Sequence, residues 1–288
     1  MRILVIGKAG QLARALADAG TEIVCLGRPS LDMAARDMIA PAVERVRPDL
    51  IVNAAAYTSV DRAESEPGLA FAVNAEGAAE LARVSATMGI PIVHVSTDYV
   101  FDGQKTTAYR EDDVPNPLGV YGASKEAGER AVREGAPRHV IVRTSRVFSV
   151  VGDNFLRTML RLAGERTHLR VVKDQVASPT AAGDLAGALL AIAERIRRDG
   201  EVPWGTYHFC GTGGVSWYQF ACAIFDGSRQ IGTRLPTIEP ISHVDRPVPA
   251  RRPGYSVLAC SKIEAAFGIV PRPWQDMLDD VMAQLRGK

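Results

Sequence analysis

The sequence predicts an α/β protein whose N-terminal half forms a doubly wound parallel sheet. From Met1 to about Thr144, short continuous apolar runs alternate with helical segments, a pattern typical of parallel strands buried on both faces. A glycine-containing turn joins the first apolar run to the first helical segment, as in nucleotide-binding βαβ units. After Thr144 the alternation stops, and stretches rich in Pro and Gly separate the remaining helical segments.

The N-terminal elements follow from hydrophobic periodicity and from the residues at their boundaries. Strands are expected at the apolar runs, over residues 3–6, 22–26, 50–52, 91–95 and 139–142. Helical periodicity predicts helices over residues 12–19, 38–46, 67–88 and 124–133. Pro48, Pro91 and Pro137 stand at or just before an apolar run, where a proline ends a helix and enters a strand.

The C-terminal half also contains helices, in a less regular order. They are expected over residues 154–165, 180–197 and 216–228. A last amphipathic helix follows from one apolar stripe, made of Trp274, Met277, Leu278, Val281, Met282 and Leu285. The 288 residues suffice for about two domains of ~150 residues each. We expect one domain over residues 1–145 and another mainly over 146–288, with some segments of the latter returning to the sheet.

Composition excludes several classes of protein. With 47% hydrophobic and 23% charged residues, the chain has the balance of a soluble globular protein. Lys and Arg number 34 against 33 Asp and Glu, and a net charge of +1 does not favour a nucleic-acid partner. No apolar stretch reaches the ~18 to 20 residues of a membrane span, and residues 3–6 are too short for a signal-peptide core. We expect a cytoplasmic protein that begins at Met1 and has no membrane partner.

The four cysteines predict neither a zinc site nor a disulfide framework. They are scattered along the chain, without a CxxC pair or a histidine-rich neighbour, at Cys25, Cys210, Cys222 and Cys260. Reduced thiols are therefore expected.

The glycine-containing turn is the first candidate binding motif. It reads Gly7-Lys8-Ala9-Gly10-Gln11-Leu12-Ala13, and Ala13 takes the place of the last glycine of the usual fingerprint. Glycines allow a tight turn and a close approach to a pyrophosphate, which is favoured at a helix N-terminus. The spacing alone fits a plain strand-to-helix turn equally well, but its place in the first βαβ unit favours dinucleotide binding by Gly7, Gly10, Gln11 and Leu12.

The residues after the second strand bear on the choice of dinucleotide. An Asp or Glu commonly binds the NAD ribose at this point, but Arg28 stands here instead. Because an arginine can pair with a 2′-phosphate, the sequence favours NADPH, although NADH stays possible and Arg28 could be a solvated loop residue. Asp32 and Met33 follow closely and could close the adenine pocket, unless Asp32 only caps the next helix.

A proton-transfer set is predicted where the fourth strand ends. Ser96-Thr97-Asp98 follow the apolar run, and Tyr121 and Lys125 have the i, i+4 spacing of one helical face. A YxxxK spacing alone is common and usually means a surface tyrosine and a solvated lysine. Beside a polar strand end and a nucleotide-binding turn, it favours catalysis by Thr97, Tyr121 and Lys125.

Motifs along nearly the whole chain resemble those of a known family. They are GKAGQL at the start, NAAAYTSVDRAE (53–64), STDYVFDG (96–103), YGASKEAGE (121–129), VRTSRVF (142–148), DQVASPT (174–180) and RPGYSVL (252–258). The chain is similar to extended short-chain dehydrogenase/reductases, and closely resembles the dTDP-4-dehydrorhamnose reductase family among them. This resemblance implies a Rossmann-like cofactor domain and a smaller C-terminal substrate-binding domain, with the active site between them.

The resemblance also implies a reaction: NADPH-dependent reduction of the 4-keto group of dTDP-4-dehydro-L-rhamnose to dTDP-L-rhamnose. Tyr121 would donate the proton, and Lys125 would lower the pKa of Tyr121 and hold the nicotinamide ribose. The implied substrate-binding residues are Thr97, Asp98, Tyr121, Arg146 and Arg252, and the implied cofactor contacts include Ala54, Ala55, Ala56, Tyr121 and Lys125. Asp98 is followed by Tyr99, whereas the related dehydratases carry a Glu there for elimination, so simple carbonyl reduction is favoured.

Two departures from the family pattern keep alternatives open. Arg146 stands where these reductases usually have a Trp that packs on the sugar, so the sugar is held differently or is a different one. Ala15 replaces a Glu that helps some members bind magnesium at a dimer interface, and we expect no metal. The chain would be a monomer or a homodimer. The alternatives are a reductase of another nucleoside-diphosphate 4-keto-6-deoxy sugar and a non-catalytic NADP-binding regulatory subunit.

Overall fold

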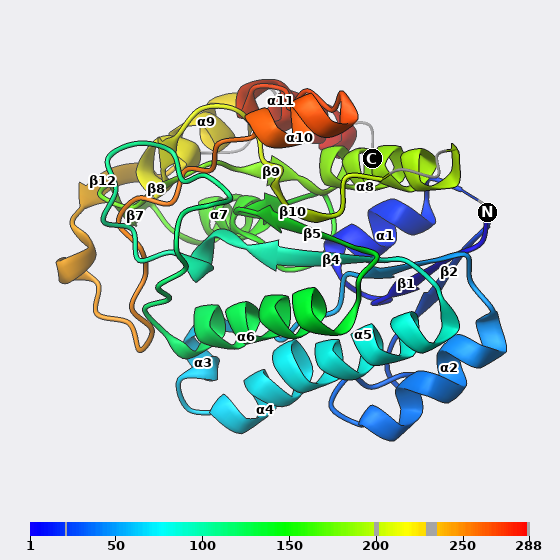
Figure 1. Cartoon of the computed structure of the whole chain (residues 1–288). Coiled ribbons are helices and arrows are strands. Elements are labelled where there is room, and N and C mark those ends of the chain that lie inside the picture. The colour runs from blue at the N-terminus through cyan, green and yellow to red at the C-terminus, as the bar shows by residue number, and fades with distance from the viewer. Residues whose placement is uncertain (21, 199–201, 229–234, 287–288) are drawn as a thin grey trace.

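A six-stranded parallel sheet forms the centre of the computed structural model, which describes residues 1–20, 22–198, 202–228 and 235–286. The strand order is β10-β5-β4-β3-β1-β2, and each neighbouring pair is parallel (Figure 1). The strands are β1 (Ile3–Ile6), β2 (Ile23–Leu26), β3 (Leu50–Asn53), β4 (Ile92–Thr97), β5 (His139–Thr144) and β10 (Gly205–His208). The predicted parallel α/β architecture is confirmed.

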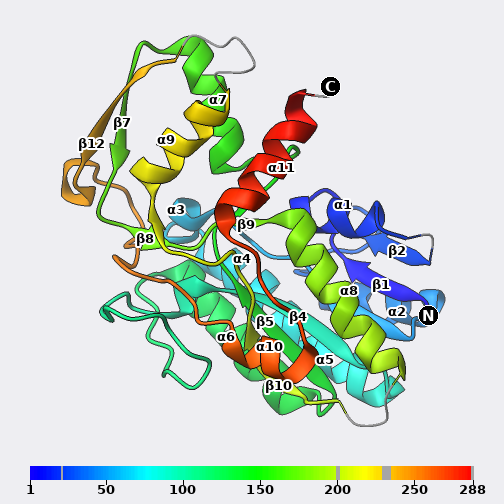
Figure 2. The same ribbon diagram turned by 90° about the horizontal axis from the view of Figure 1, so that it is seen from above.

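Helices cover both faces of the sheet (Figures 1 and 2). One face packs against α1 (Gln11–Ala17) and α8 (Ala182–Arg198), with Leu16 and Leu189 in a shared apolar core. The opposite core is formed with α2 (Ile39–Val46), α5 (Gly77–Met88) and α6 (Val120–Gly135). Short helices α3 (Val60–Ala63) and α4 (Pro67–Phe71) precede α5, and α10 (Ser261–Phe267) contacts β10.

Two N-terminal helices differ from the sequence prediction. The helix expected over 67–88 is interrupted by a π-helical turn at Ala72–Glu76, which contains the buried Asn74. Helix α6 begins at Val120, four residues earlier than predicted, so that Tyr121 lies in its first turn. A Cβ at Gly122 would lie 2.2 Å from the Tyr99 carbonyl oxygen, so this close approach of α6 to the end of β4 requires glycine.

The remaining elements form a second lobe with its own apolar core (Figure 2). Its helices are α7 (Phe155–Glu165), α9 (Trp217–Ser228) and α11 (Trp274–Arg286). Its strands form short pairs: β7 (His168–Val172) with β12 (Thr237–Ile241), β8 (Val176–Ala177) with β11 (Val215–Ser216), and β6 (Val147–Phe148) with β9 (Thr180–Ala181). Between the lobe's first and last parts the chain returns to the sheet as α8 and β10. Across the described ranges, no helix is long and apolar enough to span a membrane.

Candidate functional site

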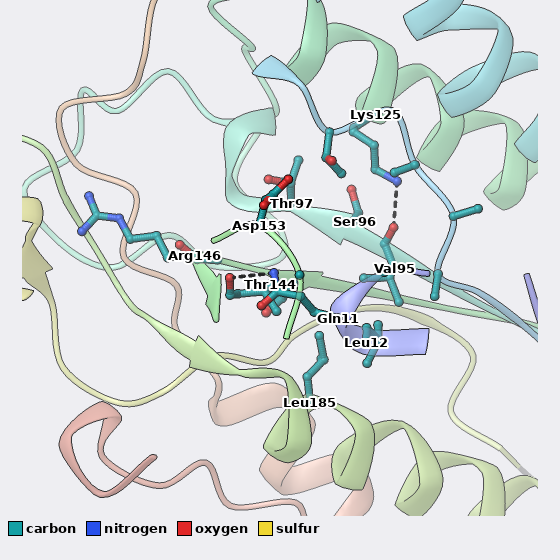
Figure 3. Close-up of a pocket in the computed structure, with 18 of the residues that line it drawn as sticks. Gln11, Leu12, Val95, Ser96, Thr97, Lys125, Thr144, Arg146, Asp153 and Leu185 are labelled. Atoms are coloured by element: carbon teal, nitrogen blue, oxygen red, sulfur yellow. Dashed lines mark hydrogen bonds between the residues drawn. The ribbon is translucent and has the colours of Figure 1, made fainter. Parts of the chain in front are cut away.

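A cavity of about 480 Å³ opens where β1, β3, β4 and β5 end, the usual ligand position in a parallel sheet (Figure 3). The glycine turn, the loop after β3, the first turns of α6 and the segment after β5 all contribute to its wall. The lining residues are Ala9, Gly10, Gln11, Leu12, Ala54, Ala55, Ala56, Thr58, Val95, Ser96, Thr97, Tyr121, Lys125, Thr144, Ser145, Arg146, Val147, Gly152, Asp153 and Leu185. Most of the predicted site residues are therefore brought together.

The glycine turn has the form that a dinucleotide pyrophosphate needs. Gly7 has a φ of 127°, which favours glycine, and its amide donates to the Leu26 carbonyl. Gly10 is the N-cap of α1, whose first turn contains no acidic residue. The helix N-terminus therefore offers free amides and a positive field to a phosphate. Opposite it, Ala54, Ala55 and Ala56 have small side chains that leave room in the cavity.

Four residues predicted to bind the cofactor lie outside the lining of this cavity, and one of them, Gly7, precedes the lining residues of the glycine turn. Arg28 is exposed, just beyond the end of β2. Asp32 accepts a hydrogen bond from the Ala34 amide at 3.0 Å, and Met33 is buried in the core on the α2 side of the sheet. Their part in cofactor binding stays a prediction.

Tyr121 and Thr97 form the polar end of the cavity. The Tyr121 ring meets Tyr99 edge to face, with centroids 5.7 Å apart. Burial raises the pKa of Tyr121, and the hydrogen bond with Thr97 opposes this only in part. The expected lowering of this pKa by Lys125 is not found; besides burial, the charges of Asp98 and Tyr99 raise the pKa. The group is therefore a neutral phenol at physiological pH, which is the form required of a proton donor.

Lys125 lies deeper, 2% exposed, against the strand that carries Thr97. Its Nζ donates to the Val95 carbonyl oxygen at 2.8 Å, as Figure 3 shows, and lies 3.5 Å from His94 Nε2. Burial lowers the pKa of Lys125 to about 8, against the opposing charge of Glu129. Lys125 can thus change its protonation state near neutral pH.

Asp98 is buried next to Thr97 and does not line the cavity. Its Oδ1 accepts from the Thr97 hydroxyl at 3.2 Å, and its Oδ2 accepts from the Ser256 hydroxyl at 2.6 Å. Burial raises the pKa of Asp98, while the hydroxyl donors lower it. Both carboxylate oxygens are bonded within the protein, so the side chain orients Thr97.

Arg146 is held by the second lobe. Its φ of 45° is left-handed, and its side chain extends away from Lys125 (Figure 3). Nη1 donates to the Val215 carbonyl oxygen at 2.7 Å and Nη2 to the Gln175 carbonyl oxygen at 2.8 Å. Burial lowers the pKa of Arg146 to about 10, so it remains charged at neutral pH.

A second cavity of about 540 Å³ lies in the other lobe. Its wall combines aromatic and cationic side chains, including Phe155, Trp217, His243, Arg246, Arg251 and Arg252. Arg252 donates to Asp61 Oδ2 at 2.8 Å, which links the second lobe to α3. The predicted substrate residue Arg252 therefore lies in this cavity, apart from Thr97 and Tyr121.

Neither Trp217 nor Asp153 is identified from the sequence as a site residue. Trp217 opens a helix directly after β11, a position at which the sequence indicates a packing residue. Asp153 lies in the turn before α7, and only the fold brings it to the first cavity. Across the part of the chain that the structure describes, no group of three or more His, Cys, Asp or Glu could hold a metal ion.

Comparisons with known proteins cover almost the whole chain. The family model described as RmlD substrate binding domain matches residues 1–286. The dTDP-4-dehydrorhamnose reductase of Sinorhizobium fredii is 45% identical over 280 residues, covering 96% of this chain and 95% of that protein. The dTDP-4-dehydrorhamnose reductase of Aggregatibacter actinomycetemcomitans is also 45% identical, with 98% of each chain covered.

Solved structures agree with these relatives. A dTDP-4-dehydrorhamnose reductase from Clostridium acetobutylicum has a TM-score of 0.92 at 34% identity, covering 99% of this chain and 100% of that one. One from Bacillus anthracis, in complex with NADP, has a TM-score of 0.90 at 35% identity, covering 98% and 99%. A Thermus thermophilus UDP-glucose 4-epimerase, at 21% identity and a TM-score of 0.80, covers 100% and 99% and shares the fold.

Proposed function

The chain belongs to the dTDP-4-dehydrorhamnose reductase family, and from that premise we propose that it reduces dTDP-4-dehydro-L-rhamnose to dTDP-L-rhamnose with NADPH. The observation that carries the proposal is the meeting of Thr97, Tyr121 and Lys125 in one cavity with the glycine turn. Thr97 and Tyr121 would hydrogen-bond a carbonyl oxygen, and the glycine turn would bind a dinucleotide. A relative crystallised with NADP supports the choice of cofactor.

The chain's own residues suggest how the cofactor is held. Gly7, Gly10 and Gln11 would receive the pyrophosphate at the N-terminus of α1, and Ala54–56 would leave space beside it. Lys125 would hold the nicotinamide ribose. When bound, the cofactor supplies the hydride that reduces C4 of the sugar. Arg28 would pair with the 2′-phosphate, with Asp32 and Met33 near the adenine, although these three residues lie outside the cavity lining.

Proton supply falls to Tyr121 in this proposal. The neutral phenol would donate its proton to the sugar O4 as the alkoxide develops, and the Thr97 hydroxyl would turn its one hydrogen from Asp98 to the same oxygen. Before substrate binds, Asp98 keeps Thr97 in place, because it accepts the Thr97 hydroxyl hydrogen while Ser256 fixes its other oxygen.

The second lobe would bind the nucleotide part of the substrate. Arg246, Arg251 and Arg252 give the second cavity positive charge for a diphosphate, and Trp217 offers a flat apolar surface. We therefore assign cofactor binding mainly to residues 1–145 and nucleotide-sugar binding mainly to 146–288. We also propose a cytoplasmic enzyme, without a metal, that acts as a monomer or homodimer.

Two other functions remain as alternatives to be tested. A reductase of another nucleoside-diphosphate 4-keto-6-deoxy sugar is suggested by Arg146, which replaces the aromatic residue usual in the family. A non-catalytic NADP-binding regulatory subunit is disfavoured, because Thr97, Tyr121 and Lys125 are all present and placed in one cavity.

The test is the loss of NADPH absorbance with a panel of dTDP-, UDP- and GDP-linked 4-keto-6-deoxy sugars. We expect turnover with dTDP-4-dehydro-L-rhamnose and formation of dTDP-L-rhamnose by mass spectrometry and NMR. Preference for another sugar would overturn the substrate assignment alone. NADPH binding without turnover of any sugar would support the regulatory subunit.

A further inference from the structure

Three buried polar side chains form a chain beneath the proposed catalytic helix. Asn53 on β3 and His94 on β4 are neighbours in the strand register, and Lys125 reaches them from α6. Asn53 and His94 are each 1% exposed, and Lys125 is 2% exposed. Neither Asn53 nor His94 lines the cavity; His94 contacts the lining residue Lys125, and Asn53 contacts both His94 and the lining residue Ala55.

The hydrogen bonds of Asn53 determine which nitrogen of His94 carries a proton. Asn53 Oδ1 accepts from the Ala55 amide at 3.2 Å, so its Nδ2 group is the one that faces His94 Nδ1 at 3.0 Å. Since Nδ2 is a donor, Nδ1 must accept. A neutral His94 ring then carries its single hydrogen on Nε2, directed toward Lys125 Nζ.

His94 is neutral at physiological pH. Burial lowers the pKa of His94 well below its ordinary value, and the positive charges of Lys125 and His139 lower it further. The buried charged side chains on the adjoining elements are Lys125 and Glu129 on α6 and Arg143 on β5, and the titratable His139 opens β5. Glu129 is bonded to Arg143, with Oε2 at 2.7 Å from Nη2, so its charge is largely compensated.

An ammonium group has three donors and no acceptor, so it repels the Nε2–H of His94, whereas a neutral amine can accept from it. We propose that His94 is a positioning residue, held in its Nε2–H form by Asn53, that stabilises the neutral amine of Lys125 relative to the ammonium. The second hydrogen bond of Lys125, to the Val95 carbonyl, serves both forms.

The catalytic role of His94 rests on the proposed reductase function. After Tyr121 has given its proton to the sugar oxygen, a proton moving from Lys125 Nζ to the phenolate restores the phenol. The neutral amine that remains accepts from His94 Nε2–H, and a proton from solvent later restores the ammonium. A lysine whose pKa lies near neutral pH is suited to this transfer, and the Nε2–H of His94 would lower that pKa in addition to burial.

The first test does not depend on activity. In protein labelled with ¹⁵N-histidine, with and without NADP⁺, the nitrogen shifts report the tautomer of each of the five histidines. His94→Gln identifies the His94 signals by their loss. We expect Nε2 protonated and Nδ1 unprotonated throughout neutral pH. A protonated Nδ1, alone or in a doubly protonated ring, would overturn the proposal.

The second test is the pH dependence of kcat with NADPH and the 4-keto sugar. His94→Gln and His94→Leu both remove the Nε2–H donor, so the pKa of Lys125 should rise and the alkaline limb should move up by about one pH unit. His168→Gln, at an exposed position in the second lobe, is the matched control and should leave the limb in place. An unmoved limb, or one moved to lower pH, contradicts the proposal even if kcat falls.

A third variant covers the case in which the His94 variants do not fold. Asn53→Ala removes the donor to Nδ1 and frees His94 to adopt the other tautomer, whose Nε2 accepts from the ammonium. The NMR signals should then change tautomer and the alkaline limb should rise. If wild-type protein shows the Nε2–H form but reduces no sugar, the proposed function fails and the assignment of His94 stands.

Discussion

The Arg146 guanidinium stacks on the Trp217 ring, 3.8 Å from its centroid, and this pair joins the walls of the first and second cavities. Arg146 lines the first cavity and Trp217 the second. Because two carbonyl groups fix the guanidinium, it holds the indole in a defined orientation. The aromatic surface expected at position 146 is thus available from Trp217, on a different element.

Replacement of Arg146 should weaken binding of the nucleotide sugar. Arg146→Trp leaves the Val215 and Gln175 carbonyls without their donors and places a bulky residue at a left-handed φ. Because these bonds fix the orientation of Trp217, their loss should raise the KM for the sugar by roughly tenfold or more, which corresponds to about 1.4 kcal/mol of binding free energy. Steady-state kinetics measure this, with exposed Arg161→Lys as the control. An unchanged KM would show that Trp217 does not depend on this stack.

Tyr121→Phe should abolish most of the turnover. General acid catalysis is worth ~100- to 10,000-fold, so kcat should fall by that factor. The NADPH dissociation constant, from fluorescence titration, should stay nearly unchanged because the ring remains. Tyr207→Phe removes the hydroxyl of a tyrosine on β10, outside the cavity lining, and should keep its turnover. Near-normal kcat in Tyr121→Phe would exclude this residue as the proton donor.

Arg28→Ala tests whether Arg28 binds the 2′-phosphate of NADPH. If the exposed guanidinium pairs with that group, the dissociation constant for NADPH should rise by roughly tenfold or more, while that for NADH hardly changes. Calorimetric titration with both cofactors measures the difference, and Arg197→Ala at the exposed end of α8 is the control. If the dissociation constants for NADPH and NADH rise equally, Arg28 supports the loop and does not bind the 2′-phosphate.

Acid should destabilise the fold through His208. Burial, together with the charge of the nearby Arg143, lowers the pKa of His208 from 6.5 to about 3. Between those values the unfolded chain binds a proton that the folded chain does not, so stability falls as pH drops below about 6.5. The slope is at most about 1.4 kcal/mol per pH unit from this group.

Urea unfolding at several pH values measures that slope. His208→Gln should flatten it, whereas His168→Gln, which changes an exposed side chain, should not. If the free energy of unfolding of His208→Gln depends on pH as steeply as that of the wild type, His208 is protonated in the folded state.

The strands of the sheet that are continuous apolar runs could be predicted from the sequence. The run Ile3–Ile6 is buried on both faces, so its composition alone indicates a parallel strand. Strand β10, by contrast, reads Gly-Thr-Tyr-His, and only its pairing with β5 makes it a strand. The same applies to β7 and β12, which are joined across the second lobe.

The candidate site shows a similar division. Tyr121 and Lys125 share one helix and one face, so their spacing predicts their proximity. The partners of Arg146 lie 69 and 29 residues away along the chain, at backbone carbonyls whose positions no local pattern specifies. The direction of the Tyr121 pKa was wrongly predicted for a related reason, since the partial burial of this ring against Tyr99 depends on the fold.

The π-helical turn at Ala72–Glu76 joins two parts of the site into one cooperative unit. It contains Asn74, whose Oδ1 accepts from the Tyr57 amide at 2.8 Å and whose Nδ2 donates to Ser124 Oγ at 2.9 Å. Tyr57 belongs to the loop after β3, beside the first cavity, and Ser124 lies on α6 between Tyr121 and Lys125. A local opening that frees the loop must therefore also loosen the catalytic helix, and amide hydrogen exchange in both segments should slow together when NADP⁺ binds.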